Sequence, residues 1–126
     1  MDVYKTRSFA QWARKAGLPD ASLAHAVREL VEGLVEADLG SGLFKKRVAA
    51  GGKGKRGAFR VLLAYRTNTV VYFLFGFEKS DRENINHREL TALRRLARHM
   101  LGYGTEALKR AIDNGELIEV LDEQNS

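Results

Sequence analysis

The chain carries a dense cluster of side chains that could bind phosphate between Gly42 and Arg66. These 25 residues contain no acidic side chain and eight basic ones: Lys45, Lys46, Arg47, Lys53, Lys55, Arg56, Arg60 and Arg66. The whole chain of 126 residues has a formal net charge of +5, so the remainder sums to −3 and the excess of cations is local. Because these cations repel one another when folding brings them together, the cluster favours a polyanionic or acidic partner. Guanidinium and ammonium groups bind phosphate, and they stabilise the negative charge that develops during phosphoryl transfer.

Two predicted strands, 43–49 and 58–66, would hold the strand cations on defined faces, because side chains alternate across a strand. Lys45 and Arg47 share one face of the first strand. In the second strand the side chains opposite Arg60 are apolar apart from one tyrosine hydroxyl, so we expect that face to pack on helices. Arg60 would then stand on the open face, and three cations would line one concave surface of the sheet.

Arg60 is the most informative of these cations. An arginine within the apolar run FRVLLAY is costly unless an anion pairs with it. No Asp or Glu lies near Arg60 in the sequence, so we expect a phosphate group to supply the missing charge in bidentate geometry. Acidic side chains of a partner protein would also suit it. The alternative for any single cation is ordinary solvated surface charge, which fits the whole set less well.

The elements that must position these side chains follow from hydrophobic periodicity and capping signals. The pattern predicts a single α+β domain over 1–126, with a curved, mostly antiparallel sheet, N-terminal helices packed against it and additional C-terminal helices. The expected elements are a strand at 2–7, a helix from a Ser8–Gln11 capping box to Gly17, a helix from an Asp20 N-cap to Gly40, strands at 43–49, 58–66 and 69–77, helices at 86–102 and 105–113, and a short strand within 116–121. At the start of the helix at 86–102, Glu89 lies three residues after an Asn86 cap, which is the spacing of a capping box.

Composition excludes several classes of site and location. The chain has no cysteine, and its three histidines show no metal-ligand spacing, so we expect no disulfide, no metal and no cofactor. The N-terminus lacks the apolar segment of a signal peptide, and no apolar run reaches the ~20 residues that span a bilayer. We therefore expect a cytoplasmic protein without a membrane partner.

Three motifs in a fixed order resemble one known family. They are LFKKRVA at 43–49, GAFRVLLAYR at 57–66 and VVYFLFGFEKSDRENI at 70–85. Together they resemble the RelE-like branch (RelE/HigB) of the RelE/ParE superfamily of type II toxin–antitoxin toxins. The resemblance implies a RelE-like fold and an endonuclease that cleaves mRNA, commonly on the ribosome, and so inhibits translation and growth. It also implies a cognate antitoxin from the adjacent gene, for which we expect a helix-turn-helix or ribbon-helix-helix protein.

The resemblance also implies roles for individual residues. Arg60 matches the family's phosphate-binding arginine, Lys45 and Arg47 match two basic residues of the preceding strand, and Lys79 and Arg82 match the arginine that follows the last long strand. Where well-known members have a tyrosine acid/base, this chain has Asn86 and His87, so His87 is a catalytic candidate that could equally be an exposed surface residue. The expected RNA-binding residues are Lys46, Lys53, Lys55, Arg56, Arg66 and Phe77, the last by stacking on a base.

Two other functions remain open at this point. ParE-like members of the superfamily inhibit DNA gyrase by protein binding, although they generally lack the basic set on the central strands. A non-catalytic RNA-binding module is the third alternative, because the family's tyrosine is missing. The nuclease reading requires no metal: the RNA 2′-hydroxyl attacks the adjacent phosphorus, and the enzyme positions the backbone, moves protons and stabilises charge.

Overall fold

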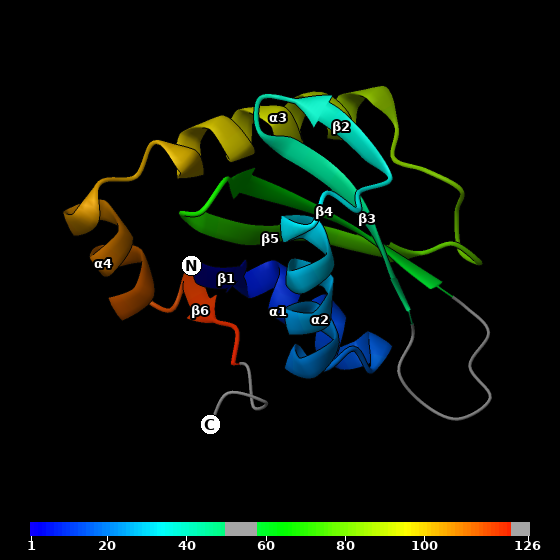
Figure 1. Ribbon diagram of the computed structural model, residues 1–126, viewed down its shortest axis with the longest axis horizontal. Helices are drawn as coiled ribbons and strands as arrows, with labels where there is room; N and C mark the ends of the chain where they lie inside the picture. Colours follow the sequence, from blue (N-terminus) through cyan, green and yellow to red (C-terminus); the bar gives the residue numbers. More distant parts are fainter. Residues whose placement is uncertain (50–57, 122–126) are drawn as a thin grey trace.

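The structure is a computed structural model that describes residues 1–49 and 58–121. It has the predicted α+β architecture, with six strands and four helices in the described residues (Figure 1). The elements are β1 (Asp2–Thr6), α1 (Arg7–Ala16), α2 (Asp20–Val31), β2 (Ala37–Gly40), β3 (Leu43–Ala49), β4 (Ala58–Arg66), β5 (Val70–Glu78), α3 (His87–Leu101), α4 (Thr105–Asp113) and β6 (Leu117–Glu119).

The strands form one open sheet in the order β2-β3-β4-β5-β1-β6. Only β1 and β5 pair in parallel, and the other neighbouring strands are antiparallel. The sheet is therefore mostly antiparallel, as the dense β-branched and aromatic runs of β4 and β5 predict. Helices α1 and α2 lie on one side of the sheet and α3 crosses the other (Figure 1).

The side covered by α1 and α2, here called the α1/α2 face, holds the first apolar core. Phe9 from α1 and Leu23 from α2 are fully buried there against Val61, Leu63 and other residues of the central strands. The close approach of α1 depends on Gly76 in β5, because a Cβ at that position would lie 2.2 Å from a ring atom of Trp12. The expectation that the apolar side of β4 packs on helices is confirmed.

The opposite side, here called the α3 face, is half covered rather than open. Leu93, Ala97 and Met100 of α3 pack on Leu62 and Ala64 of β4 within the second core. The expectation of an open concave face is therefore wrong for half of the strands, since the α3 helix shields the half that starts from the β4–β5 turn.

Three arginines and a glycine fix the C-terminal half of α3. Arg94 Nε donates to the Leu39 carbonyl at 2.5 Å, and Arg98 donates to the Ser41 hydroxyl at 2.8 Å, so α3 is bonded to the β2–β3 hairpin. Arg66 donates to the Leu101 carbonyl at the end of the helix. Gly42 leaves room for Leu101, whose Cδ1 would lie 2.4 Å from a Cβ at that position.

Three predicted helix boundaries differ from those of the structure. Helix α1 begins at Arg7, and the Thr6 side chain, not Ser8, caps it by accepting from the Phe9 N–H at 3.1 Å. Asp20 is the first residue of α2 rather than its N-cap; its carboxylate accepts from Lys5 and from the Leu121 N–H instead.

Helix α2 ends at Val31, nine residues before the expected stop, because Gly33 adopts a left-handed φ of 90°. The residues predicted as its last turns form β2. At the N-terminus of α3 the expected capping box of Asn86 and Glu89 is present, so that boundary is confirmed.

Candidate functional site

Three of the four strand cations on the α3 face lie close together in β3 and β4, towards the half of these strands that α3 does not cover. Lys45 lies opposite Leu62, and Arg47 lies directly opposite Arg60 in the β3–β4 ladder. Directly opposite residues of an antiparallel pair project to the same face, so all three cations share it. Two like charges at one ladder position are destabilising without a nearby anion. The predicted grouping of Lys45, Arg47 and Arg60 on one face therefore agrees with the strand register.

A glutamate that the sequence-based reasoning overlooked joins two of these cations. The Glu36 carboxylate lies 2.9 Å from Arg60 Nε and 3.4 Å from Lys45 Nζ. Glu36 precedes β2, and its N–H donates to the Lys45 carbonyl at 2.9 Å, so the β2–β3 pairing brings it to the cluster. The expectation that Arg60 lacks an acidic partner is wrong, because strand pairing supplies one from 24 positions earlier.

Glu36 satisfies only part of the Arg60 guanidinium. Arg60 is 9% exposed, and its Nη1 is buried with no hydrogen-bond partner among the described residues. An unmet buried donor of a charged group costs free energy, which a suitably placed oxygen would recover. Arg47, across the ladder, is exposed. The cluster therefore combines a fixed, underbonded arginine with cations that an anion in solvent can reach.

A further cation of the α3 face, Arg82, lies beside this cluster. Its guanidinium carbon lies 5.2 Å from the ring centre of Phe75 and 5.3 Å from that of Phe77. Phe77 is the ladder partner of Arg60 across β4 and β5. Arg82 is thus connected to Arg60 through one aromatic side chain.

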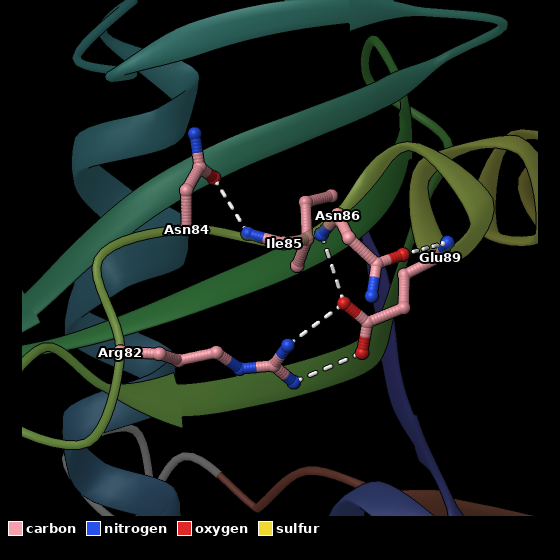
Figure 2. Close-up of polar contacts among 5 residues, drawn as sticks. All are labelled: Arg82, Asn84, Ile85, Asn86 and Glu89. Atoms are coloured by element: carbon pink, nitrogen blue, oxygen red, sulfur yellow. Dashed lines mark hydrogen bonds and ion pairs between the residues drawn. The ribbon is translucent and has the colours of Figure 1, made fainter.

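Glu89 holds Arg82 from the first turn of α3 (Figure 2). Its carboxylate accepts from Arg82 Nη1 at 2.7 Å and from Nη2 at 3.0 Å, and also from the Asn86 N–H at 2.9 Å. The hydrogen bonds from Arg82, followed by the one from Asn86, hold the pKa of Glu89 below its ordinary value of 4.5. One carboxylate thus closes the helix cap and pairs with the arginine.

Two predicted RNA contacts are corrected by their burial. Lys46 lies on the α1/α2 face, is 6% exposed and pairs with Glu29 of α2 at 2.8 Å, so it is separated from Lys45 and Arg47. Alternation along β3 causes this separation. Phe77 is 4% exposed and lies under Arg82, so its ring is not open for a base to stack on it.

The other predicted residues lie at or beyond the edges of the cluster. Lys79 and His87 are exposed, the first just after β5 and the second in the first turn of α3. Arg66 bonds to the far end of α3, six residues along β4 from Arg60 and so about 20 Å away. The loop cations Lys53, Lys55 and Arg56 lie outside the described residues.

The chain as a whole matches one protein family. The sequence model described as the RelE toxin of the RelE/RelB toxin–antitoxin system matches residues 1–120. The chain belongs to the RelE toxin family. This RelE-family chain is a toxin of a toxin–antitoxin system, and its family implies a cognate antitoxin partner. No curated protein sequence matches it significantly. Within residues 1–49 and 58–121, no helix of this toxin is long and apolar enough to cross a membrane.

Sequence reasoning missed two carboxylates of this toxin's site for different reasons. Glu36 lies outside the recognisable motifs and reaches Arg60 only through a strand that was predicted as helix. Glu89 was recognised as a cap residue, but its pairing with Arg82 depends on the path of the loop between β5 and α3. The only sequence signal for the Arg82–Glu89 pair was an acidic residue in the first turn of a helix, seven positions after an arginine.

Proposed function

We propose that this toxin is a metal-independent endonuclease that cleaves mRNA on the ribosome, and that the Lys45–Arg47–Arg60 cluster binds the scissile phosphate. The observation that carries the proposal is Arg60, a buried arginine whose Nη1 has no partner within residues 1–49 and 58–121, beside like-charged Arg47. A phosphate oxygen would satisfy that donor and neutralise the repulsion across the ladder. Membership of the RelE toxin family supports an RNA substrate.

The reaction is a transfer at phosphorus within the RNA itself. The 2′-oxygen forms a bond to the adjacent phosphorus, and the bond from phosphorus to the 5′-oxygen breaks. The 2′-hydroxyl proton passes to a base, and an acid delivers a proton to the leaving 5′-oxygen. The products are a 2′,3′-cyclic phosphate and a 5′-hydroxyl.

The cations of the cluster would act mainly on charge. Arg60 would bind the phosphate and Lys45 would stabilise the negative charge that grows on its oxygens, since both are held in fixed geometry by Glu36. Arg47 and Lys79, which are exposed, would extend the contact to the flanking backbone. His87 is our candidate for proton transfer, because imidazole titrates near neutral pH and the side chain is open to solvent in the turn that follows Arg82.

The two partners follow from the same arrangement. Ribosome binding would use Lys53, Lys55 and Arg56, whose segment joins β3 to β4 and so enters and leaves the sheet beside the cluster. The antitoxin would silence the toxin by covering the cluster with acidic and apolar groups or by displacing α3. Charge complementarity would speed that capture.

The test is cleavage of an mRNA on programmed ribosomes, with and without a single 2′-deoxy substitution at the scissile position. The ribose message should be cut and leave a 5′-hydroxyl end. The cut should persist when EDTA removes tighter-binding metals such as Zn²⁺ and Mn²⁺ while enough free Mg²⁺ remains to keep ribosomes intact. The deoxy message should bind and remain whole, because the nucleophile is missing. Equal cleavage of both would contradict the mechanism, whereas intact messages with accumulating gyrase-linked DNA breaks would favour a ParE-like activity.

A further inference from the structure

The end-on N–H fork of Arg82 is occupied by a carboxylate of the protein itself. Arginine binds phosphate through a fork of two parallel N–H groups. Both terminal nitrogens of Arg82 already donate to the two oxygens of Glu89, at 2.7 and 3.0 Å. Glu89 itself is fixed by the Asn86 N–H, so releasing Arg82 would also disturb the α3 cap (Figure 2). The charge of Arg82 is therefore already paired, which weakens its attraction for a phosphate.

What Arg82 retains is a flat surface. One side of its guanidinium group lies over Phe75 and Phe77, within 5.3 Å of both ring centres. The side chain is 36% exposed, so part of Arg82 is open to solvent while its guanidinium carbon lies close to both rings. RNA-binding proteins use guanidinium planes as well as aromatic rings for stacking unpaired bases.

We propose that Arg82 is a stacking platform for a nucleobase rather than a phosphate ligand. The rings of Phe75 and Phe77 would support its guanidinium group, and the Glu89 carboxylate would hold it in place. This inference rests on the proposed function, because it takes the scissile phosphate to lie at Arg60. Phe77 and Arg60 are ladder partners, whose Cα atoms are about 5 Å apart in an antiparallel pair. A nucleotide whose phosphate contacts Arg60 would therefore have its base within reach of Arg82.

The charge of Arg82 distinguishes the platform from a phosphate contact. Each phosphate that a cation neutralises on single-stranded RNA adds about 0.7 to the slope of log affinity against log salt concentration. Arg82 is already neutralised by Glu89, so its removal together with Glu89 should leave that slope unchanged. Stacking of one base is worth about 5- to 150-fold in affinity, largely independent of sequence.

The experiment measures binding of a single-stranded oligoribonucleotide that carries a 2′-deoxy substitution at the scissile position, and of a series in which one base at a time is abasic. The toxin is compared with the double variant Arg82→Met/Glu89→Gln. Methionine keeps the aliphatic cover over the two rings, and glutamine keeps the acceptor for the Asn86 N–H, so no carboxylate is left unpaired beside the RNA. Thermal unfolding confirms that the double variant is folded.

We expect the double variant to bind the intact oligonucleotide about 5- to 150-fold more weakly, with an unchanged salt slope. One abasic position should weaken binding to the unaltered toxin by a similar factor and should have no further effect on the double variant. Lys79→Met is the matched control: it should lower the slope by about 0.7 and leave the abasic effect intact.

The remaining results would each overturn a different statement. A slope that falls by about 0.7 in the double variant would identify Arg82 as a phosphate contact. That result would contradict the stacking platform but not the proposed function. Equal abasic effects in both proteins would mean that no base rests on Arg82. If the unaltered toxin bound none of the oligonucleotides, a base-stacking platform on the free toxin would be excluded, whereas the proposed function is judged separately by cleavage on programmed ribosomes.

Discussion

The two faces of the sheet each bury a cation against a glutamate, but the surroundings of the two pairs differ. On the α1/α2 face Lys46 pairs with Glu29 beside apolar side chains of the first core, such as Phe44 and Val48. On the α3 face Arg60 pairs with Glu36, and a further arginine, Arg47, stands directly opposite it. The first pair is locally complete in charge, whereas the second leaves cations in excess. This difference is the basis of our proposal that the cations of the α3 face bind phosphate, whereas we expect the Lys46–Glu29 pair to contribute to stability.

The positions of the helices explain why the two faces differ, even between neighbouring residues of the same strands. Val48 and Phe59, ladder partners on the α1/α2 face, are both buried in the first core. Their neighbours Arg47 and Arg60 project to the other face, beyond the residues that α3 covers. The same stretch of β3 and β4 is thus closed on one side and accessible on the other.

The largest effect expected from this comparison is on activity. Arg60→Ala should lower cleavage by about 10²- to 10³-fold, as is typical when a fixed donor to a developing oxyanion is removed. Lys46→Met, on the α1/α2 face, should leave cleavage within about twofold, because it removes a cation from the closed side. Single-turnover cleavage and growth inhibition at matched protein levels measure both. Equal losses in the two variants would contradict the division between faces.

A substitution on the closed face should affect stability instead. In Gly76→Ala the new Cβ would meet three Trp12 ring atoms at 2.2–2.6 Å, so α1 must shift. Overpacking of this kind costs about 1–3 kcal/mol. Denaturant unfolding measures the loss, and Trp12→Phe in the same chain should recover part of it because the smaller ring makes room. Cleavage per folded molecule should not change, and a drop there would mean that the closed face also shapes the site.

Removing the charge of Glu36 or of Glu29 tests the same difference between the two faces of the sheet. Glu36→Gln keeps an acceptor for Arg60 Nε but removes a negative charge next to the proposed phosphate position. At about 4 Å in a high dielectric that charge is worth about 1 kcal/mol, so RNA binding should tighten about fivefold. Glu29→Gln, its counterpart on the α1/α2 face, should leave RNA affinity unchanged. Fluorescence anisotropy with an uncleavable RNA compares the two, and a fall in affinity for Glu36→Gln would mean that Glu36 aids RNA binding by positioning Arg60 and Lys45 more than its charge opposes it.

The sequence predicted the parts of the fold that local patterns determine. Alternation in β3 and β4 assigned every strand cation to its correct face, and the Asn86–Glu89 capping box located the start of α3. The end of α2 was missed, because its apolar spacing continues past Val31 and only the backbone conformation of Gly33 stops the helix.

The partners of the cations could not be predicted in the same way. Glu36 meets Arg60 through pairing of β2 with β3, and Glu89 meets Arg82 through the loop after β5, so neither contact has a sequence period. Both are consequences of tertiary structure. The candidate site was therefore predictable as a set of cations on one face, and not as a set of ion pairs.

The smallest expected effect is on the pH dependence of stability. It tests whether the Arg82–Glu89 ion pair behaves like the Lys46–Glu29 pair on the α1/α2 face. Hydrogen bonds from Arg82 lower the pKa of Glu89, and the one from Lys46 lowers the pKa of Glu29. A carboxylate whose pKa is lowered by folding stabilises the fold above its unfolded pKa, and that contribution is lost as the pH falls through the folded pKa.

Both glutamates should therefore contribute to stability at neutral pH. That contribution should be lost below about pH 4.5, because the two carboxyl groups take up protons at a higher pH in the unfolded chain than in the folded one. Glu89→Gln and Glu29→Gln should each flatten the stability curve in this acid range, and only slightly, since both carboxylates are about one-third exposed and partly screened. Urea unfolding between about pH 3 and pH 7 measures the two curves. A curve for Glu89→Gln that parallels that of the unaltered toxin would mean that the Arg82–Glu89 pair is not maintained in solution. Glu89 would then not hold Arg82 in position for stacking on a base.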